Sequence, residues 1–298
     1  EAYFRDAVCH EAGGYALRSR ALPSSTSVWI CVSPGEDVVA ERWRSHGEFV
    51  DCSLIAAFLN NGNGLFLDVG ANLGGCTLLL ASQGFSVVAI EPNPTTAKLL
   101  KAAVLRNGFE ERVQVMQVAA GKRRSQSQLQ CSGHSATCQV FEGGDDVESV
   151  TLESLFEEHP AEQLHAVKID VEGSEEDVII GASSLLASMK PLLFLELHAF
   201  ELRERGSSSG AVVDRLLNQL GYLQASLLSG DLQCPRPLVP ENGTYPSATW
   251  TGSIWKAEQA ENACLCAKAC WQQLRKGCRC WDFTSLRCRL FRSCPFAP

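Results

Sequence analysis

Apolar runs of strand length alternate with segments of helical spacing from residue 64 to about residue 228. This alternation predicts a parallel sheet covered by helices, because each parallel strand needs a long crossover connection before the next one. The runs contain few alternating polar positions, which indicates strands buried on both faces. The predicted strands are 65–69, 86–90, 113–118, 166–171, 192–197 and 222–228.

Helical spacing fills the intervals between these strands. Two helix starts are visible in the sequence. Pro94 with Thr95 begins one helix, and Ser174 precedes three acids that suit the positive first turn of another. The predicted helices are 73–82, 95–107, 152–159, 174–188 and 212–220.

Two segments lie outside this alternation. Residues 121–147 are rich in Ser, Gln, Gly and Asp, so we expect a loop or small hairpin inserted after the third strand, in a position suited to a substrate lid. Residues 1–63 precede the first strand, and we expect them to form a helical cap over one edge of the sheet.

Cysteine and charge divide the chain near Cys234. Of the 14 cysteines, eight lie from Cys234 onward, where Lys and Arg also exceed Asp and Glu, although the whole chain has a net charge of −8. We therefore predict an N-terminal cap over 1–63, a main domain over 64–230 and a cysteine-rich module over 234–298. We expect no nucleic-acid partner, and no apolar run is long enough to predict a membrane span in this chain.

The segment from residue 64 to residue 92 holds the strongest chemical signal. A strand that ends in Asp68 is followed by Gly70, Asn72 and Gly74 at the start of a helix. Glycine lets a ligand approach the backbone closely, and Asn is the residue that best replaces it at positive φ. Glu91 ends the next strand, about 20 residues on, where an acid can accept hydrogen bonds from both ribose hydroxyls. The pattern predicts a nucleoside site.

Two nucleoside cofactors compete for this site. A dinucleotide site uses G-x-G-x-x-G and binds pyrophosphate at the helix start, whereas the glycines here are Gly70, Gly74 and Gly75, and Asp68 would add negative charge beside a phosphate. S-adenosylmethionine has no phosphate and carries an ammonium and a sulfonium, which an acid attracts. The sequence therefore favours S-adenosylmethionine over a nicotinamide dinucleotide.

Four motifs occur in order: "FLDVGANLGGCTLLLA", "IEPNP", "VTLESL" and "VKIDVEGSEEDVIIGA". Together they resemble the FkbM family of S-adenosylmethionine-dependent methyltransferases. The resemblance implies an α/β class I methyltransferase fold, a Rossmann-like seven-stranded sheet with one antiparallel strand and helices on both faces, and usually O-methylation. It implies that Asp68, Gly70, Asn72 and Gly74 surround the amino-acid part of the cofactor. Glu91 would bind the ribose and Ala119 would lie beside adenine, while Cys76 is expected to be buried packing.

The acceptor chemistry is expected at the ends of two later strands. Asp170 and Glu172 share a face with Lys168, and Glu196 and His198 end the next strand, so adjacent strands would bring the two sets together. We predict Asp170 and Glu172 as cofactor and acceptor contacts and His198 as general base, since its ordinary pKa of about 6.5 suits proton acceptance.

Simpler roles remain for several of these groups. Lys168 is expected to neutralise an acid such as Asp170 or Glu196, and His198 could be purely structural. Glu175 and Glu176 are expected to be helix-start charges. A divalent metal held by Asp170, Glu172 and Glu196 is the weaker alternative, because the spacing matches no known metal signature, and the prediction is no metal site.

The cysteine-rich tail contains no histidine and no C-x-x-C pair, so disulfides are favoured over zinc. Residues 264–294 resemble an apple or PAN module, which binds glycans or proteins. That resemblance implies pairing of Cys266 with Cys288 and of Cys270 with Cys278. Upstream, Cys131 and Cys138 could close a disulfide loop or bind metal with His134, and the disulfide is favoured.

These patterns predict an S-adenosylmethionine-dependent O-methyltransferase acting on a saccharide or another small-molecule or glycoconjugate hydroxyl. Asn242-Gly243-Thr244 is a glycosylation sequon, and with the disulfides it favours the lumen of the secretory pathway or the extracellular space, after removal of a targeting segment before Glu1. Since the cofactor is made in the cytosol, a luminal enzyme needs an imported supply. The alternative is therefore an inactive methyltransferase-fold protein that binds glycans or proteins.

Overall fold

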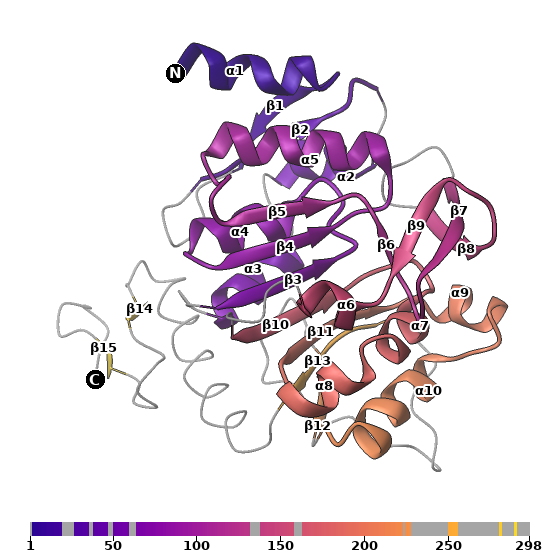
Figure 1. Cartoon of the computed structure of the whole chain (residues 1–298). Coiled ribbons are helices and arrows are strands. Elements are labelled where there is room, and N and C mark those ends of the chain that lie inside the picture. Colours follow the sequence, from indigo (N-terminus) through magenta and orange to yellow (C-terminus); the bar gives the residue numbers. More distant parts are fainter. Residues whose placement is uncertain are drawn as a thin grey trace.

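A computed structural model gives the architecture shown in Figure 1. The structure describes residues 2–19, 27–35, 38–46, 50–59, 64–131, 138–157, 163–222, 224–227, 250–255, 280–281 and 289–290.

A seven-stranded sheet forms the centre of the molecule, in the order β12-β13-β11-β10-β3-β4-β5. All neighbours pair in parallel except β13, which is antiparallel to both β11 and β12. The six predicted strands are all present, with ends that differ from the prediction by no more than two residues. The bounds are β3 Leu65–Val69, β4 Ser86–Ile90, β5 Val113–Met116, β10 Leu164–Ile169, β11 Leu192–Leu197, β12 Gln224–Leu227 and β13 Trp250–Trp255.

Helices cover both faces of this sheet. Successive side chains along a strand point to opposite faces, and they are buried in two separate core clusters. Phe66 packs into one core cluster, whereas Leu65 and Leu67, its neighbours on β3, pack into the other. The first cluster takes in α4 (Gly75–Ser82) and α5 (Pro94–Asn107). The second lies under α6 (Leu152–Glu157), α7 (Glu175–Ile180), α8 (Ser183–Met189) and α10 (Ser209–Asp214), which continues as a π-helical turn over Arg215–Gln219.

The single helix predicted over 174–188 is two helices, α7 and α8. Gly181 lies at the break. A Cβ atom there would come within 2.1 Å of the carbonyl oxygen of Gly121, so only glycine allows the chain of the insert to pass this closely. Local helical periodicity could not reveal this contact because its partner lies 60 residues away in the chain.

The N-terminal segment contains a hairpin in addition to the predicted helices. Helix α1 (Ala2–Glu11), strands β1 (Tyr15–Arg18) and β2 (Trp29–Val32), and helices α2 (Val38–His46) and α3 (Val50–Leu59) precede β3. Helix α1 and strand β2 contact α5, and α3 contacts α4. The side chain of Asn107, at the end of α5, holds β2 by accepting the backbone N–H of Trp29 and donating to its carbonyl. The segment thus shares one core with the main domain.

The insert after the third strand is the predicted hairpin. Strands β7 (Ser125–Cys131) and β8 (Cys138–Glu142) pair in antiparallel fashion, and β6 (Ala119–Ala120) and β9 (Val147–Val150) complete a four-stranded sheet in the order β6-β9-β7-β8. This small sheet lies beyond the carboxyl ends of β3 and β4 (Figure 1). A Cys131–Cys138 disulfide joins the two hairpin strands, as the sequence favoured.

Residues 250–255 belong to the central sheet, although the predicted boundary assigned them to the cysteine-rich module. Strand β13 pairs with β11 from Leu193 to Leu197, so it is an integral part of the main domain's sheet. Cysteine density marks where cross-links are needed and carries no information about strand pairing. Beyond it, β14 (Cys280–Trp281) pairs with β15 (Arg289–Leu290), and the remaining predictions for the module, including its disulfides and Asn242, lie outside the described residues.

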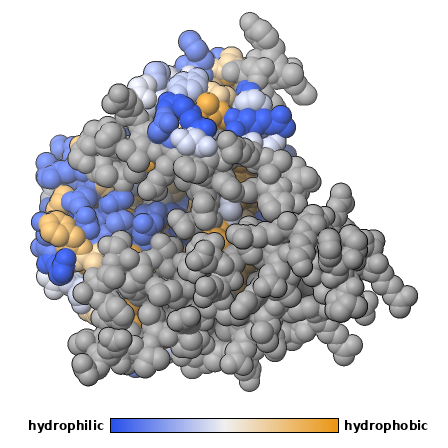
Figure 2. Space-filling model, turned by 180° about the vertical axis from the view of Figure 1, so that it is seen from behind, coloured by the Kyte–Doolittle hydropathy of each residue, from blue (hydrophilic) through white to orange (hydrophobic). Residues whose placement is uncertain are grey.

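Among the described residues, no helix combines the length and the apolar character that crossing a bilayer requires. Figure 2 shows the face opposite to that of Figure 1, where the described residues at the upper and left margins are mostly hydrophilic.

Candidate active site

A cavity of about 220 Å³ opens at the carboxyl ends of β3, β4, β10 and β11. This is where the strand order reverses, because β4 follows β3 on one side and β10 flanks it on the other. The lining includes predicted cofactor residues Gly70, Asn72, Glu91 and Ala119 and predicted acceptor residues Asp170 and Glu172. The other predicted site residues, Asp68, Gly74 and His198, are not among the described residues that line this cavity. Asp68 and Gly74 belong to the loop beside it, and His198 lies next to Asp170 and Glu172.

The turn after β3 has the backbone that its sequence predicts. Gly70, Asn72 and Gly74 all have positive φ, at 77°, 50° and 87°. The side-chain oxygen of Asn72 accepts the backbone N–H of Leu73 at 2.7 Å, which helps an L-residue to occupy this conformation. Gly74 admits no side chain, since a Cβ atom there would lie 2.2 Å from Cδ1 of Leu100. The turn therefore presents backbone, with little side chain, to the cavity.

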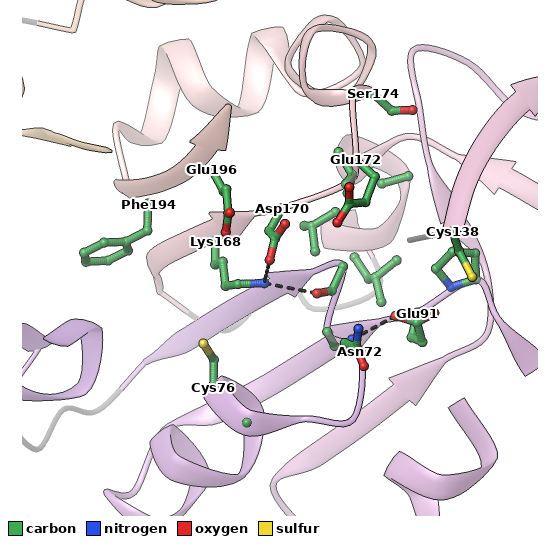
Figure 3. Close-up of a pocket in the computed structure, with 18 of the residues that line it drawn as sticks. Asn72, Cys76, Glu91, Cys138, Lys168, Asp170, Glu172, Ser174, Phe194 and Glu196 are labelled. Carbon is green, nitrogen blue, oxygen red and sulfur yellow. Dashed lines mark hydrogen bonds and ion pairs between the residues drawn. The ribbon is translucent and has the colours of Figure 1, made fainter. Parts of the chain in front are cut away.

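Asp68 is completely buried and holds this turn from below. Its Oδ2 accepts a hydrogen bond from Thr77 at 2.6 Å, and its Oδ1 lies 3.3 Å from the ammonium of Lys168. Lys168 also donates to the carbonyl of Gly70 at 3.0 Å and lies 3.3 Å from Asp170. Figure 3 shows the ammonium of Lys168 directed at Asp170. Asp68 thus reaches the cavity only through Lys168 and the loop backbone.

Lys168 performs the neutralising role predicted for it, with Asp68 and Asp170 as its partners. Its side chain is 14% exposed. Burial by itself would lower the pKa of Lys168, but the two carboxylates outweigh this effect and raise the pKa above its ordinary value. The lysine is therefore a fixed positive charge between two strands.

Glu91 lies at the end of β4 and is only 5% exposed. Its two carboxylate oxygens accept the backbone N–H groups of Asn72 at 2.8 Å and of Asn93 at 2.9 Å. Burial raises the pKa of Glu91 to about 7, although both backbone donors favour the ionised form. Glu91 therefore ties the glycine turn to the start of α5.

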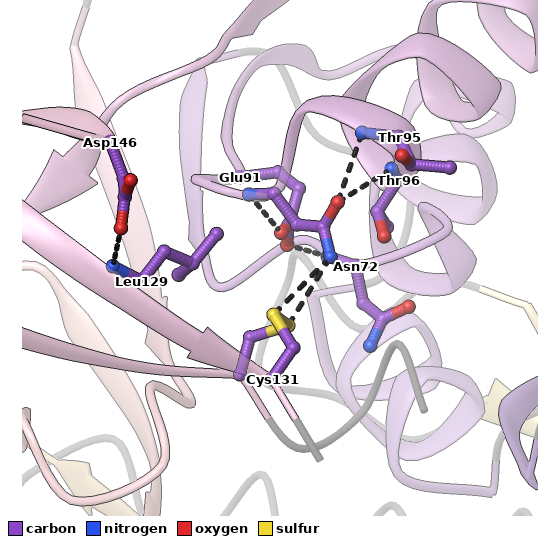
Figure 4. Close-up of a disulfide and its surroundings, with 9 residues drawn as sticks. Asn72, Glu91, Thr95, Thr96, Leu129, Cys131 and Asp146 are labelled. Carbon is purple, nitrogen blue, oxygen red and sulfur yellow. Dashed lines mark hydrogen bonds between the residues drawn. A yellow bond between two sulfur atoms is a disulfide. The ribbon is translucent and has the colours of Figure 1, made fainter. Parts of the chain in front are cut away.

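Asn93 links parts of the site that the sequence analysis did not connect, although it stands in the quoted "IEPNP" motif. Its side-chain oxygen accepts the N–H groups of Thr95 and Thr96 and so caps α5. Its amide nitrogen lies 3.2 Å from the sulfur of Cys138 and 3.6 Å from that of Cys131. Figure 4 shows Cys131 of this disulfide near Glu91. One residue thus joins the Glu91 loop, a helix start and the disulfide of the insert.

The ends of β10 and β11 come together as predicted. His198 Nε2 lies 3.5 Å from a Glu172 oxygen, 3.9 Å from Asp170 and 4.0 Å from Glu196. Its Nδ1 lies 2.7 Å from Oε1 of Glu175, which is 0% exposed. Glu175 was expected to be a helix-start charge, and it does lie in the first turn of α7, but its side chain also turns inward and contacts the imidazole. A sequence pattern cannot distinguish the two because both roles use the same position of the helix.

The environment changes the protonation of this cluster. Burial raises the pKa of Glu172 to about 7. Burial favours a neutral His198, but the hydrogen bond with Glu175 and the nearby Glu172 and Asp170 carboxylates outweigh it and raise the pKa of His198 to about 9. The prediction of His198 as general base relied on its ordinary pKa. That pKa is raised here because four carboxylates surround the ring.

Cys76 is buried in the core, as predicted, but it also forms a disulfide with Cys52 that joins α4 to α3 and was not predicted. Both cysteines line the cavity, and Figure 3 shows Cys76 on the helix below it. A third disulfide, Cys9–Cys31, joins α1 to β2. No cysteine with a described side chain is free. No local pattern indicates the Cys52 pairing, because 24 residues separate the partners.

The family model described as "Methyltransferase FkbM domain" matches residues 68–223, just over half of the chain. No curated protein matches this sequence. A methyltransferase FkbM structure from Methylobacillus flagellatus KT is similar at 14% identity and a TM-score of 0.44, over 65% of this chain and 44% of that one. An O-methyltransferase from Bacillus cereus in complex with SAH is similar at 12% identity and a TM-score of 0.38, over 70% of this chain and 80% of that one.

The chain thus spans less than half the length of the Methylobacillus structure. Because both TM-scores are below 0.5, the structural similarities add no argument to the match with the family model.

Proposed function

Because the chain belongs to the FkbM methyltransferase family, we propose that it transfers the methyl group of S-adenosylmethionine to a hydroxyl of an acceptor molecule. The observation that carries this proposal is the position of Glu91. Its buried carboxylate lies in the cavity at the point where the strand order reverses, beside a turn that exposes backbone. A phosphate-free adenosine compound suits such a site, since the glycines at Gly70, Gly74 and Gly75 depart from the G-x-G-x-x-G spacing that binds a pyrophosphate.

The cofactor is assigned to this cavity part by part. The Glu91 carboxylate accepts hydrogen bonds from the ribose hydroxyls, and Ala119, which is buried in β6, lies beside the adenine. The backbone of Gly70 and Asn72 surrounds the amino-acid part, with Asp68 and Gly74 holding that turn in shape. The ammonium and sulfonium of the cofactor then meet a cavity whose mouth carries Asp170, Glu172 and Glu196.

The reaction is an in-line displacement. A lone pair of the acceptor oxygen forms the new bond to the methyl carbon, the carbon–sulfur bond breaks with its electron pair remaining on sulfur, and S-adenosylhomocysteine leaves. The proton of the hydroxyl passes to a carboxylate beside it, for which Asp170 and Glu172 are available in the lining of the cavity. Alignment of the three reacting atoms supplies about 7–11 kcal/mol in well-oriented systems, so positioning is the main task of these residues.

A saccharide or another polyhydroxylated glycoconjugate is the acceptor class we propose. The carboxylates of Asp170, Glu172 and Glu196, which line the cavity, can accept hydrogen bonds from several hydroxyls at once. The three described disulfides support a lumenal or extracellular setting, where such acceptors are displayed. A cysteine-rich module over 234–298 that binds glycan or protein would hold the acceptor near the site.

Calorimetric titration with S-adenosylhomocysteine tests the cofactor assignment. The wild-type protein should bind one equivalent, and Glu91→Ala should weaken binding about 100-fold, because two hydrogen bonds to a charged acceptor are lost. Glu110→Ala, which removes an exposed carboxylate from the turn after α5, should change nothing. Binding of NAD in place of S-adenosylhomocysteine would overturn the proposal.

Transfer of a labelled methyl group to a panel of glycans, glycolipids and glycoproteins tests the acceptor. Transfer that depends on Glu91 supports an enzyme. Tight cofactor binding without transfer to any acceptor would favour the alternative of an inactive methyltransferase-fold binding protein.

A further inference from the structure

We propose that Asp170, Glu196 and His198 form a binding site for a divalent cation at the carboxyl ends of β10 and β11. One ligand atom from each of these three side chains lies within 4.8 Å of the other two. The strands pair in parallel with Ile169 opposite Leu195, so Asp170 and Glu196 come next in register at the same edge. The cluster is therefore produced by the regular geometry of the sheet.

The orientation of His198 is an independent indication of a metal ligand. Its Nδ1 is 2.7 Å from Glu175 Oε1, and the same oxygen accepts the backbone N–H of Gly173 at 3.0 Å. Because Nδ1 is held by this buried carboxylate, Nε2 faces Asp170 and Glu196, and a cation that displaces the Nε2 proton would bind its lone pair. A histidine that binds a metal through one nitrogen usually donates its other N–H to a carboxylate in this way.

The distances around Nε2 fit an ion better than a proton. The nearest carboxylate oxygens of the described residues lie at 3.5, 3.9 and 4.0 Å, beyond the length of a good hydrogen bond. A single proton on Nε2 could serve only one of these three oxygens. A cation with ligand distances of about 2.0–2.6 Å needs its ligand atoms separated by several ångströms, as they are here.

The charges of the site also favour a cation. Within the described residues, five carboxylates approach Lys168 or His198, namely Asp68, Asp170, Glu172, Glu175 and Glu196. The lysine is already shared between Asp68 and Asp170 Oδ2, which leaves Asp170 Oδ1 directed at His198. Carboxylates favour hard ions and imidazole favours transition metals, so Mn²⁺, which accepts both, is the probe we choose.

The role of this ion rests on the proposed methyl transfer, whereas its binding does not. Asp170, Glu172 and Glu196 all line the cavity, and Figure 3 shows the Glu172 carboxylate near that of Asp170. A cation there would bind the acceptor hydroxyl and make its proton easier to remove. Glu172, which is not one of the three ligands, is then placed to receive that proton.

Electron paramagnetic resonance of free Mn²⁺ tests the site on the full chain after removal of metals with a chelator. The wild-type protein should deplete the signal of free Mn²⁺ saturably, by one equivalent. Glu196→Gln and His198→Ala should each weaken binding at least about tenfold, and Glu175→Gln about 10–100-fold, as expected for a residue that acts through its ligand. Glu110→Gln, which makes the same chemical change at an exposed position, should bind as the wild type does.

The unfolding temperature, the affinity for S-adenosylhomocysteine and the binding of Zn²⁺ are measured alongside. Glu196→Gln should retain its unfolding temperature, and the wild-type protein freed of metals should retain its affinity for S-adenosylhomocysteine, which separates failure of the metal site from failure of the proposed cofactor site. Tighter binding of Zn²⁺ than of Mn²⁺, lost in the same variants, also supports the site. Absence of saturable binding of either ion at millimolar concentration, or binding that Glu196→Gln and His198→Ala both retain, overturns the proposal.

Discussion

The carbonyl oxygen of Asp170 lies so close to Gly70 that a Cβ atom on the glycine would come within 1.8 Å of it. The two residues follow adjacent strands, β3 and β10, and this approach brings the turn of the proposed cofactor site against the proposed acceptor residues. The glycine therefore connects the two halves of the site by having no side chain.

Gly70→Ala is expected to lower the free energy of unfolding by more than about 3 kcal/mol, because the new methyl group overlaps backbone that cannot move easily and φ is 77°. Denaturant unfolding measures the change. Gly13→Ala is the matched control, since its φ of 87° is equally unfavourable but nothing lies within 4 Å. That variant should lose only about 1–2 kcal/mol. Equal losses in the two variants would contradict the role given to the close approach.

The affinity for S-adenosylhomocysteine is expected to rise between about pH 6 and pH 8. Burial raises the pKa of Glu91 to about 7, so below that pH the carboxyl holds a proton and offers fewer acceptors to the ribose. Above it the carboxylate is ionised and accepts from both hydroxyls. Calorimetry across this range should show the rise in wild type and a flat, weaker affinity in Glu91→Gln. The same rise in Glu91→Gln would show that another group titrates.

Replacing Lys168 with Met is expected to cost about 3–5 kcal/mol of stability. The variant leaves Asp68 buried without its ion pair, and removing one partner of a buried pair is costly because the other charge stays desolvated. Lys122→Met is the control: Lys122 also pairs with two acids, Glu142 and Asp177, but its side chain is 37% exposed. Water screens such a pair, so its loss should cost no more than about 1 kcal/mol. Thermal unfolding of both variants makes the comparison.

Removing the Cys131–Cys138 disulfide is expected to weaken cofactor binding several-fold as well as to destabilise the protein by about 2 kcal/mol. The reason is Asn93, whose amide contacts this disulfide while its backbone N–H holds Glu91. The double variant Cys131→Ser with Cys138→Ser should show both effects.

The Cys9–Cys31 disulfide provides the comparison for this prediction, because neither cysteine lines the cavity among the described residues. Its double serine variant should lose stability yet bind S-adenosylhomocysteine as the wild type does. If both double variants bind equally well, the link from the insert through Asn93 to Glu91 has no role in binding.

The sequence by itself determined the features that depend on neighbouring residues. Apolar runs predicted the strands. The spacing of Gly70, Asn72 and Gly74 predicted the turn and its positive φ values, and the alternation along β10 predicted that Asp170 lies at the cavity. Such features are local because backbone conformation and the side of a strand are set within a few residues.

Only the tertiary structure decided which distant groups meet. It paired Cys52 with Cys76, turned Glu175 inward onto His198, placed Asn93 against the insert's disulfide and brought residues 250–255 into the sheet. Periodicity reports that a side chain is buried but not what it is buried against, and the pKa of His198 depends on that second fact. The proposed metal site and the protonation of the acceptor cluster therefore follow from packing between strands, which no local pattern in the chain contains.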